Sequence, residues 1–168
     1  MRFKNFGVLA AVALLSACAS GSEDKGTTSG AGSAATAKPA VSAAATNVIA
    51  PGSQEDLVAN VGDRVFFGYD KYTLNDKSRV MLDKQAAWLN ANPAVKIDIQ
   101  GHCDERGTRE YNLALGERRA NSVKDYLVQL GLNSSRVRTI SYGKERPVAV
   151  GSMEASWTQN RRSVTVVQ

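Results

Sequence analysis

Residues 95–131 read VKIDIQGHCDERGTREYNLALGERRANSVKDYLVQLG and carry the plainest secondary-structure pattern of the chain. Residues 95–100 alternate strictly between apolar and polar side chains, which predicts a β-strand with one buried face. A charged loop follows, and Thr108 is a suitable N-cap for a helix that Gly131 would end. Apolar or small residues recur in this helix every three or four positions. They are Leu113, Gly116, Ala120, Val123, Leu127 and Leu130.

Similar patterns flank this stretch on both sides. Short β-favouring runs predict further strands, and apolar residues spaced by three, four and seven predict further helices. The strands are expected at residues 64–67, 137–142 and 163–167, and the helices at residues 55–61, 77–91 and 154–162. An extended arm is the alternative for the first of these helices, and a turn for the last. Strands that alternate with helices indicate an α/β layer fold with at least part of the sheet parallel.

The first residues of the chain have the pattern of an export signal. Arg2 and Lys4 form a short basic region, and the apolar run that follows is too short to span a bilayer. It ends in the sequence LSAC at residues 15–18, which resembles the lipobox of bacterial lipoproteins. We therefore expect residues 1–17 to be a lipoprotein signal peptide and Cys18 to carry the lipid. Ordinary secretion, with Cys18 lost or in a disulfide, is the alternative.

Composition divides the rest of the chain into two parts. Residues 18–54 are rich in Ala, Gly, Ser and Thr, and such a segment cannot bury enough apolar surface to offset the entropy of ordering. We expect a lipidated N-terminus and flexible linker there, followed by one folded domain over residues 55–168. Loss of residues 1–17 removes two basic residues and no acid, so the net charge falls from +5 to +3. The remaining basic residues are interspersed with acids, which is unlike a nucleic-acid-binding protein.

The charged loop holds the chain's single histidine, His102, beside Cys103. A cysteine–histidine nucleophile needs the two side chains within hydrogen-bond reach, but successive strand residues point to opposite faces. A structural zinc site needs about four cysteine or histidine ligands, which the chain lacks. Asp104 and Glu105 are adjacent, whereas the carboxylates of a glycoside hydrolase lie about 5–9 Å apart at separate positions. We therefore expect neither a catalytic thiol, nor a metal site, nor a hydrolytic carboxylate pair. We also expect Cys103 to be at least partly buried.

Helical-wheel geometry distinguishes the two neighbouring arginines of the predicted helix. At about 100° per residue, Arg118 lies about 160° from the apolar stripe and faces solvent, whereas Arg119 lies about 60° away at its margin. Arg119 is therefore placed to fold back toward the loop that carries Asp104. An ordinary Asp104–Arg119 pair that only holds the loop is the alternative to a binding role.

The stretch over residues 101–131 closely resembles the signature of OmpA-like peptidoglycan-binding domains. Supporting segments follow in the family's order at residues 66–74, 105–120, 137–148 and 160–166. The resemblance covers about residues 60–168, and the signal, lipobox and linker agree with it. It implies an α/β fold of the βαβαβ type, a two-layer sandwich in which helices pack against a mixed sheet.

The resemblance also implies a ligand. This is the stem peptide of peptidoglycan, held through meso-diaminopimelate, whose side chain ends in both an ammonium and a carboxylate. The family's site residues fall on Asp70, Asp104 and Arg119. Arg119 would take the ligand carboxylate, while Asp70, with Asp104, would satisfy the ammonium or orient loop amides. The expected walls of the site are Phe67, Tyr111, Asn112 and Leu115. Cys103 stands where Ala or Thr is usual in the family, which suggests a packing role.

The function that the resemblance implies is a non-enzymatic anchor without a cofactor. Lipid on Cys18 would hold the outer membrane, and Ala19 replaces the Asp that typically retains lipoproteins at the inner membrane. The domain would face the periplasm and bind the cell wall, which supports envelope integrity and constriction at cell division. TolB, a periplasmic propeller protein of the Tol system, is the second implied partner. An enzyme acting on peptidoglycan and a purely protein-binding periplasmic module are the alternatives.

Overall fold

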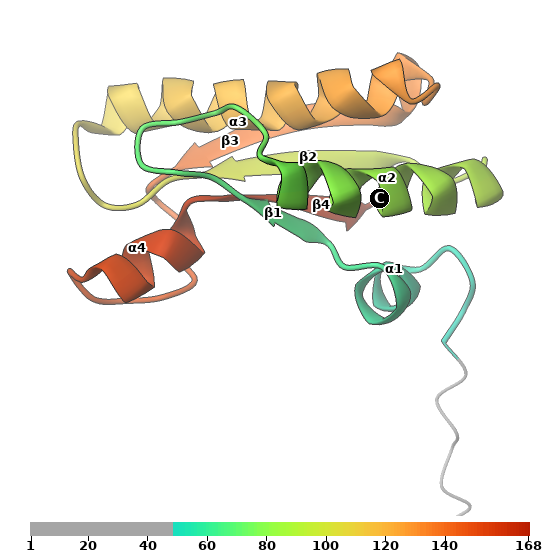
Figure 1. Cartoon of the computed structure of the whole chain (residues 1–168), viewed down its shortest axis with the longest axis horizontal. Helices are drawn as coiled ribbons and strands as arrows, with labels where there is room; N and C mark the ends of the chain where they lie inside the picture. The colour runs from blue at the N-terminus through green and yellow to red at the C-terminus, as the bar shows by residue number, and fades with distance from the viewer. Residues whose placement is uncertain (1–48) are drawn as a thin grey trace, which may run out of the picture. The chain divides into compact units, whose positions relative to one another are not determined.

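The computed structural model of the chain describes residues 49–168 (Figure 1). The predicted signal peptide, the predicted lipidation at Cys18 and the predicted linker as far as residue 48 lie outside the described residues. The helices and strands follow in the order α1 (Gln54–Asn60), β1 (Arg64–Phe66), α2 (Asp76–Ala91), β2 (Ile97–His102), α3 (Arg109–Gln129), η1 (Ser134–Arg136), β3 (Val137–Gly143), α4 (Glu154–Asn160) and β4 (Arg162–Val167). All the predicted strands and helices are present, and only the short 3-10 helix η1 was not predicted.

The four strands form one mixed sheet in the order β1-β4-β2-β3. Strands β2 and β3 are parallel and are connected through α3, whereas β4 pairs antiparallel with both β1 and β2. Helices α2 and α3 cover one face of the sheet, and the main core lies between these helices and the strands. Figure 1 shows α3 on one side of the sheet and α1 and α4 on the other. The prediction of an α/β sandwich with a mixed sheet is confirmed.

Helix α3 begins as predicted and buries Gly116, Ala120, Val123 and Leu127 as expected, but two of the predicted stripe residues are not buried. The Thr108 hydroxyl accepts a hydrogen bond from the Tyr111 backbone N–H and caps the helix. Leu113 and Leu130, which were expected in the apolar stripe, are 45% and 38% exposed. In the first half of the helix, Asn112 and Arg119 take the core-facing positions in place of Leu113, whereas Leu130 lies past the last helical residue, at the C-cap.

Strand β2 is buried on both faces, so the prediction of a single buried face is wrong. Ile97 and Ile99 enter the core as expected. Asp98, on the opposite face, is buried as well, because Arg138 donates to its carboxylate at 2.8 and 2.6 Å and Gln168 donates at 2.6 Å. Alternation of residue types predicts a solvated polar face, but it cannot show that neighbouring side chains cover that face.

Helix α1 is fastened to the domain by its polar side chains as well as by buried Leu57. The amide of Gln54 donates to the Thr165 carbonyl at 3.3 Å and accepts from the Val167 backbone N–H at 2.7 Å. The Trp88 indole of α2 donates to Asp56 at 2.9 Å. The start of the described chain is therefore linked directly to β4 and α2.

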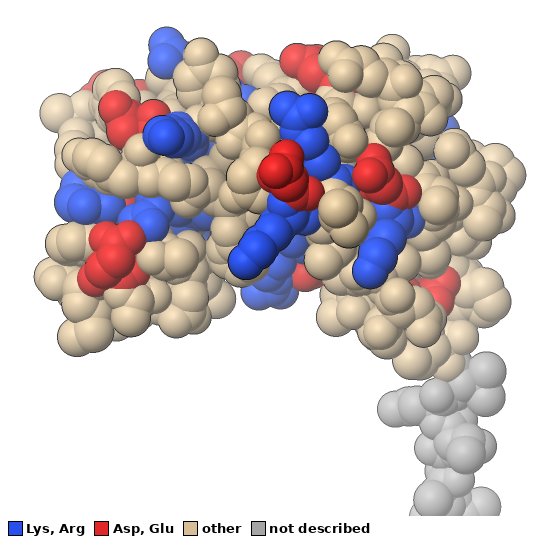
Figure 2. Space-filling view, in the orientation of Figure 1, with Lys and Arg blue, Asp and Glu red and all other residues tan. Residues whose placement is uncertain are grey.

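The surface of the described residues carries charges of both signs. Figure 2 shows basic and acidic side chains interspersed on one face of the molecule. Within residues 49–168, none of the helices combines the length and the apolar character that a membrane crossing requires.

Candidate functional site

A cavity of about 170 Å³ opens where two loops meet the first half of α3. We call it the charged cavity, because carboxylates and guanidinium groups line it together. The loop after β1 contributes Tyr69 and Asp70, and the loop after β2 contributes Cys103, Asp104, Arg106 and Gly107. Helix α3 contributes Tyr111, Asn112, Leu115 and Arg119.

Asp104 lies at the base of the loop after β2 and is 5% exposed. Its carboxylate accepts from the Arg106 guanidinium at 2.5 and 3.2 Å and from the Arg106 backbone N–H at 3.2 Å. Arg161, at the end of α4, donates to it at 3.4 Å. Burial by itself raises the pKa of Asp104, but the hydrogen bonds from Arg106 and Arg161 outweigh burial, so the pKa lies below its ordinary value. The carboxylate is therefore negatively charged at neutral pH.

Arg119 is almost wholly buried and binds the main chain of the loop after β1 and of the last residue of β2. Its guanidinium donates to the carbonyl oxygens of Lys71 at 2.8 Å, His102 at 2.8 Å and Gly68 at 3.1 Å. Its Cζ also lies 5.3 Å from the centre of the Phe67 ring. An arginine carries five N–H donors, so these three bonds leave two donors for a ligand. Arg119 thus joins the loop after β1 to the end of β2, from which the second loop of the cavity starts.

The direct Asp104–Arg119 pair that sequence reasoning left open does not form within the described residues. Asp104 is paired with Arg106 and Arg161 instead. Arg119 does fold back toward the loop of Asp104, as the helical wheel predicted, but it binds backbone carbonyls there. Because Arg119 is buried, it lies deeper than the margin position that was expected.

Asp70 occupies a rare backbone conformation at the rim of the cavity. Its φ angle is +55°, in the left-handed region that residues other than glycine seldom adopt. The Tyr111 hydroxyl donates to its carboxylate and links the loop after β1 to α3. Such strain persists only where the surroundings hold it, and it gathers at binding sites.

Asn112 lines the charged cavity, but its side-chain hydrogen bonds hold the loop after β2 in place. Its side-chain amide donates to the carbonyls of Arg106 at 2.7 Å and Thr108 at 3.0 Å. From the other side, the Lys144 ammonium donates to the carbonyls of Glu105 and Gly107. The loop after β2 is therefore braced from α3 and from the end of β3.

His102 and Cys103 point away from each other, as the strand geometry predicted. Cys103 lines the charged cavity, whereas His102 lines a separate groove on the other side of the sheet. Both residues are buried, which confirms the expectation for Cys103. Burial raises the pKa of the Cys103 thiol to about 11, so the thiol stays protonated and is a poor nucleophile. Among residues 49–168, no three histidine, cysteine or carboxylate side chains are grouped so that they could hold a metal ion.

The structure gathers six of the seven predicted binding residues around the charged cavity. Phe67 does not line it but is buried next to Arg119. Sequence reasoning missed Arg106, which lies between the rings of Tyr69 and Trp157 at 4.1 and 4.0 Å from their centres. Its position two residues after Asp104 was the available signal, because opposite charges so close in a loop favour pairing. The residues around Tyr69 and Trp157 in the sequence give no signal that these two rings would lie against Arg106.

A family model described as the OmpA family matches residues 66–161, which include every residue of the charged cavity. The chain belongs to the OmpA family. Its membership agrees with the mixed sheet and with the segment order found in the sequence.

Several curated proteins give a more specific likeness to this chain. A protein named peptidoglycan-associated lipoprotein from Rhizobium meliloti is 56% identical over 117 residues, which cover 70% of this chain and 66% of that protein. About a third of that relative's length therefore lies outside the match. A protein of the same name from Brucella melitensis is 54% identical, and the match covers 70% of each chain. Neither name describes an enzymatic activity.

A solved structure gives the same result. The crystal structure of the peptidoglycan-associated lipoprotein from Burkholderia pseudomallei is 46% identical and has a TM-score of 0.62. The superposition covers 63% of this chain and 90% of that one. Sequence and fold therefore agree on the same group of relatives.

Proposed function

We infer that this chain is an outer-membrane lipoprotein whose domain binds peptidoglycan without forming a covalent bond. The observation that carries this proposal is the charged cavity, a small space lined by two carboxylates and two guanidinium groups. Such a set is complementary to a ligand that carries both signs of charge at one end. The names of the relatives support the same ligand class.

The side chain of meso-diaminopimelate fits this set of charges. Asp70 makes one hydrogen bond within the described residues, to Tyr111, so its carboxylate has acceptor capacity left for an ammonium. Arg119 has two N–H donors left for a carboxylate and is held rigidly by its carbonyl partners. Asp104, engaged by Arg106 and Arg161, supplies negative charge at the base and keeps the loop amides oriented.

Specificity in this proposal comes from the ligand carboxylate. A stem peptide with lysine in place of diaminopimelate keeps the ammonium but lacks the carboxylate. It would leave the free donors of the buried Arg119 without a partner, and an unpaired buried donor is costly. The domain therefore discriminates against the lysine peptide mainly through Arg119.

The anchor half of the proposal rests on the LSAC sequence at residues 15–18 and on the lipoprotein names of the relatives. Lipid on Cys18 holds the outer membrane, and the domain holds the wall from the periplasm. By the same family likeness the protein works in the Tol-Pal system, has TolB as a second partner and supports envelope integrity and cell division. We expect replacement of Cys18 by serine to abolish incorporation of labelled fatty acid, and an adduct that persisted would refute the lipidation site.

Calorimetric titration with two stem peptides tests the binding proposal. The full-length chain carrying Cys18→Ser is titrated with a diaminopimelate peptide and with its lysine counterpart, and we expect the first to bind at least about tenfold more tightly. Asp70→Asn and Arg119→Lys should each weaken binding of the diaminopimelate peptide, whereas the exposed control Arg118→Lys should not. Equal affinity for the two peptides would refute diaminopimelate recognition.

Purified cell-wall sacculi separate this proposal from its two alternatives. We expect the protein to sediment with sacculi and to release no soluble muropeptides from them. Release of muropeptides would establish an enzyme. Failure of the wild-type chain to sediment would favour a module that binds only proteins.

A further inference from the structure

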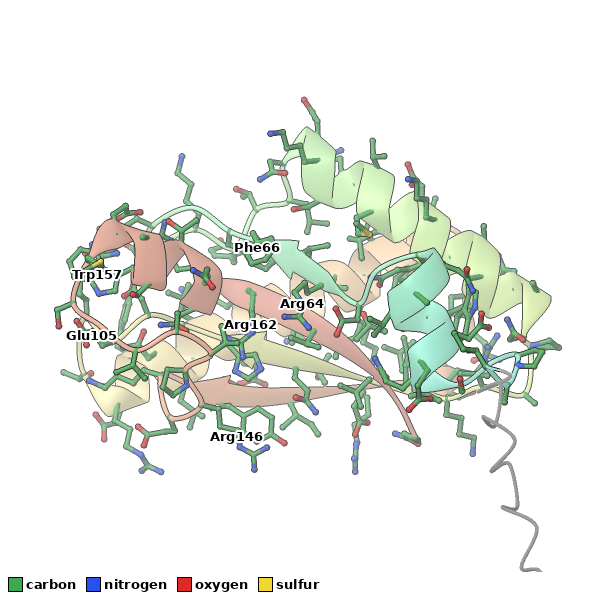
Figure 3. The ribbon with its side chains drawn as sticks, turned by 90° about the horizontal axis from the view of Figure 1, so that it is seen from below. Arg64, Phe66, Glu105, Arg146, Trp157 and Arg162 are labelled. Carbon is green, nitrogen blue, oxygen red and sulfur yellow. The ribbon has the colours of Figure 1, made fainter. Side chains whose placement is uncertain are left out.

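A second concave surface lies on the side of the sheet that α2 and α3 leave uncovered. It encloses about 310 Å³ and is lined by residues of β1, β2, β4 and the segment after β3. Figure 3 shows Arg64, Arg146 and Arg162 around it, with α1 and α4 at its two ends. In Figure 2 the outline is hollowed between the same two helices, and basic side chains lie at the top of the hollow. We call it the basic groove.

Strand register explains why these side chains meet. Gln100 pairs with Val164, and Val164 pairs with Arg64, so the three form one row across the sheet. Arg162 pairs with Phe66 in the adjacent row and lies on the same face as Val164. His102, two residues after Gln100, extends that face on β2. The pairing of β1, β4 and β2 therefore builds the groove.

The basic groove holds a buried arginine that has no carboxylate partner among residues 49–168. Arg162 is 7% exposed, and its guanidinium donates only to the carbonyls of Asn160 and Arg146, both at 3.4 Å. Burial and the neighbouring charge of Arg64 lower its pKa. An arginine so deeply buried is costly unless an anion accompanies it.

Neither of the other two arginines of the groove brings a carboxylate that could pair with Arg162. Arg146 is exposed and makes no ion pair in the described part of the chain, and its guanidinium lies 3.9 Å from the centre of the Tyr142 ring. Arg64 is paired with Asp63 at 2.8 Å. Three arginines and one aspartate leave a charge of two positive units at the groove.

His102 provides an independent sign of a missing ligand. It is 3% exposed and lines the groove, yet neither of its ring nitrogens makes a hydrogen bond within the described residues. Its ring stacks on Tyr142 with centres 5.5 Å apart. This contact uses the face of the ring and leaves both nitrogens free to make hydrogen bonds in the ring plane. Burial, followed by the charges of Arg162 and Arg146, lowers its pKa to about 4. The neutral ring thus offers one donor and one acceptor.

We propose that the basic groove binds the dianionic phosphoryl group of phosphate or of a phosphate monoester. The charge of such a group is about −2 near neutral pH and balances the excess at the groove, whereas a carboxylate would balance only half of it. The planar guanidinium groups of Arg146 and Arg162 can donate paired hydrogen bonds to its oxygens. Pro147, Val148 and Val164 give the groove an apolar wall for an organic substituent. The site lies apart from the charged cavity, so its test does not depend on peptidoglycan binding.

The single histidine of the chain makes a direct test possible. The full-length, untagged protein carrying Cys18→Ser is labelled with ¹⁵N, and the imidazole signals of His102 are followed by NMR at constant ionic strength and pH 7. Inorganic phosphate, glycerol 3-phosphate and dihexanoyl phosphatidic acid are the three probes, and acetate is the control anion. We expect saturable shifts of the His102 signals with the phosphoryl probes. We also expect the pKa of His102 to rise by about one unit or more when a probe is bound.

The three probes distinguish the possible sources of the phosphoryl group. Equal affinity for all three indicates free phosphate, and tighter binding of glycerol 3-phosphate indicates a soluble ester. Tighter binding of the short-chain lipid indicates a lipid headgroup. Each of these results supports the proposal, whereas no saturable shift at about 20 mM of any probe, or an equal response to acetate, overturns it.

Two substitutions locate the site. Arg146→Gln removes an exposed side chain, so the fold should survive, and we expect it to weaken binding at least about tenfold. Arg162→Lys keeps the buried charge but loses the planar fork, and it should weaken binding in the same direction. The matched control Arg79→Gln, on the exposed surface of α2, should leave affinity unchanged. Wild-type affinity in Arg146→Gln would overturn the proposal.

Discussion

Gly101 of β2 and Gly116 of α3 meet backbone to backbone, without a side chain between them. A Cβ atom on Gly101 would overlap the Gly116 carbonyl oxygen and would lie 2.6 Å from its carbonyl carbon. The helix therefore lies close enough to the strand for the Arg119 guanidinium to reach the His102 carbonyl at 2.8 Å. The close approach of the two glycines therefore fixes the distance between α3 and β2, and with it the position of Arg119 in the charged cavity.

Replacement of Gly101 by alanine should destabilise the protein strongly. The new methyl group meets backbone atoms of α3, which cannot move without shifting the whole helix, and we expect a loss of about 3 kcal/mol or more. Urea unfolding of the full-length chain measures it. Gly68→Ala is the control, because the three atoms nearest its new Cβ all belong to the flexible side chain of Lys71, the first of them at 3.3 Å. A similar loss in both variants would contradict the close-contact explanation.

Arg119→Lys should lower stability as well as ligand affinity. An ammonium cannot reproduce the planar fork that reaches three carbonyls at once, so two of them lose their donor. We expect the free energy of unfolding to fall by roughly 2–4 kcal/mol. Arg118→Lys, one residue away and exposed, should change it by less than about 0.5 kcal/mol. Equal free energies of unfolding for the two variants would show that the carbonyl contacts of Arg119 do not stabilise the fold.

The stability that Asp104 contributes should depend on pH in a defined window. Its pKa in the folded chain lies below the ordinary value of 3.8, so its contribution is fully present above that value. The contribution is lost as the pH falls through the folded pKa. Near pH 7, Asp104→Asn should cost roughly 3 kcal/mol, because it leaves the buried Arg161 without one carboxylate partner.

Thermal unfolding at pH values from about 7 to 2 checks this prediction. The difference between wild type and Asp104→Asn should shrink below about pH 4. Asp125→Asn, on the exposed side of α3, should follow the wild type throughout. A difference that stayed constant down to pH 2 would show that the carboxylate charge is not involved.

Cys103 should react slowly as long as the protein is folded. Its pKa is raised from 9.0 to about 11, which reduces the thiolate fraction about 100-fold near pH 8. In a chain carrying Cys18→Ser it is the only thiol, so iodoacetamide labelling followed by mass spectrometry reports on it alone. We expect labelling to reach the rate of free cysteine only in denaturing urea. Rapid labelling of the native chain would disprove the burial of the thiol.

The helices and strands were predictable because their signals are local. Thr108 caps α3, and the apolar spacing that follows it is a property of consecutive residues. The position of β4 between β1 and β2 was not predictable, since strand order depends on contacts between distant segments. The burial of Asp98 escaped prediction for the same reason, because its partner Arg138 lies on another strand.

The binding residues were only partly predictable. Asp104 and Arg119 follow from their places in a recognisable signature, and the helical wheel separated Arg119 from Arg118. What Arg119 binds could not be read from its own surroundings in the sequence, because the Gly68 and Lys71 carbonyls come from a loop about 50 residues earlier. Arg161 and Trp157 complete the site from α4 and its C-terminal end, more than 50 residues after Asp104.

The attachment of Gln54 to β4 has a mechanical consequence. The described chain enters the domain through α1, before β1, whereas the charged cavity opens beyond the far end of β1. A force between residue 49 and a molecule held in the cavity therefore acts along the strands, and Gln54 passes part of it to β4 through Thr165 and Val167. Because this force runs along β4, the hydrogen bonds that β4 makes with β1 and β2 are loaded in shear, and the rate at which they break together governs forced unfolding.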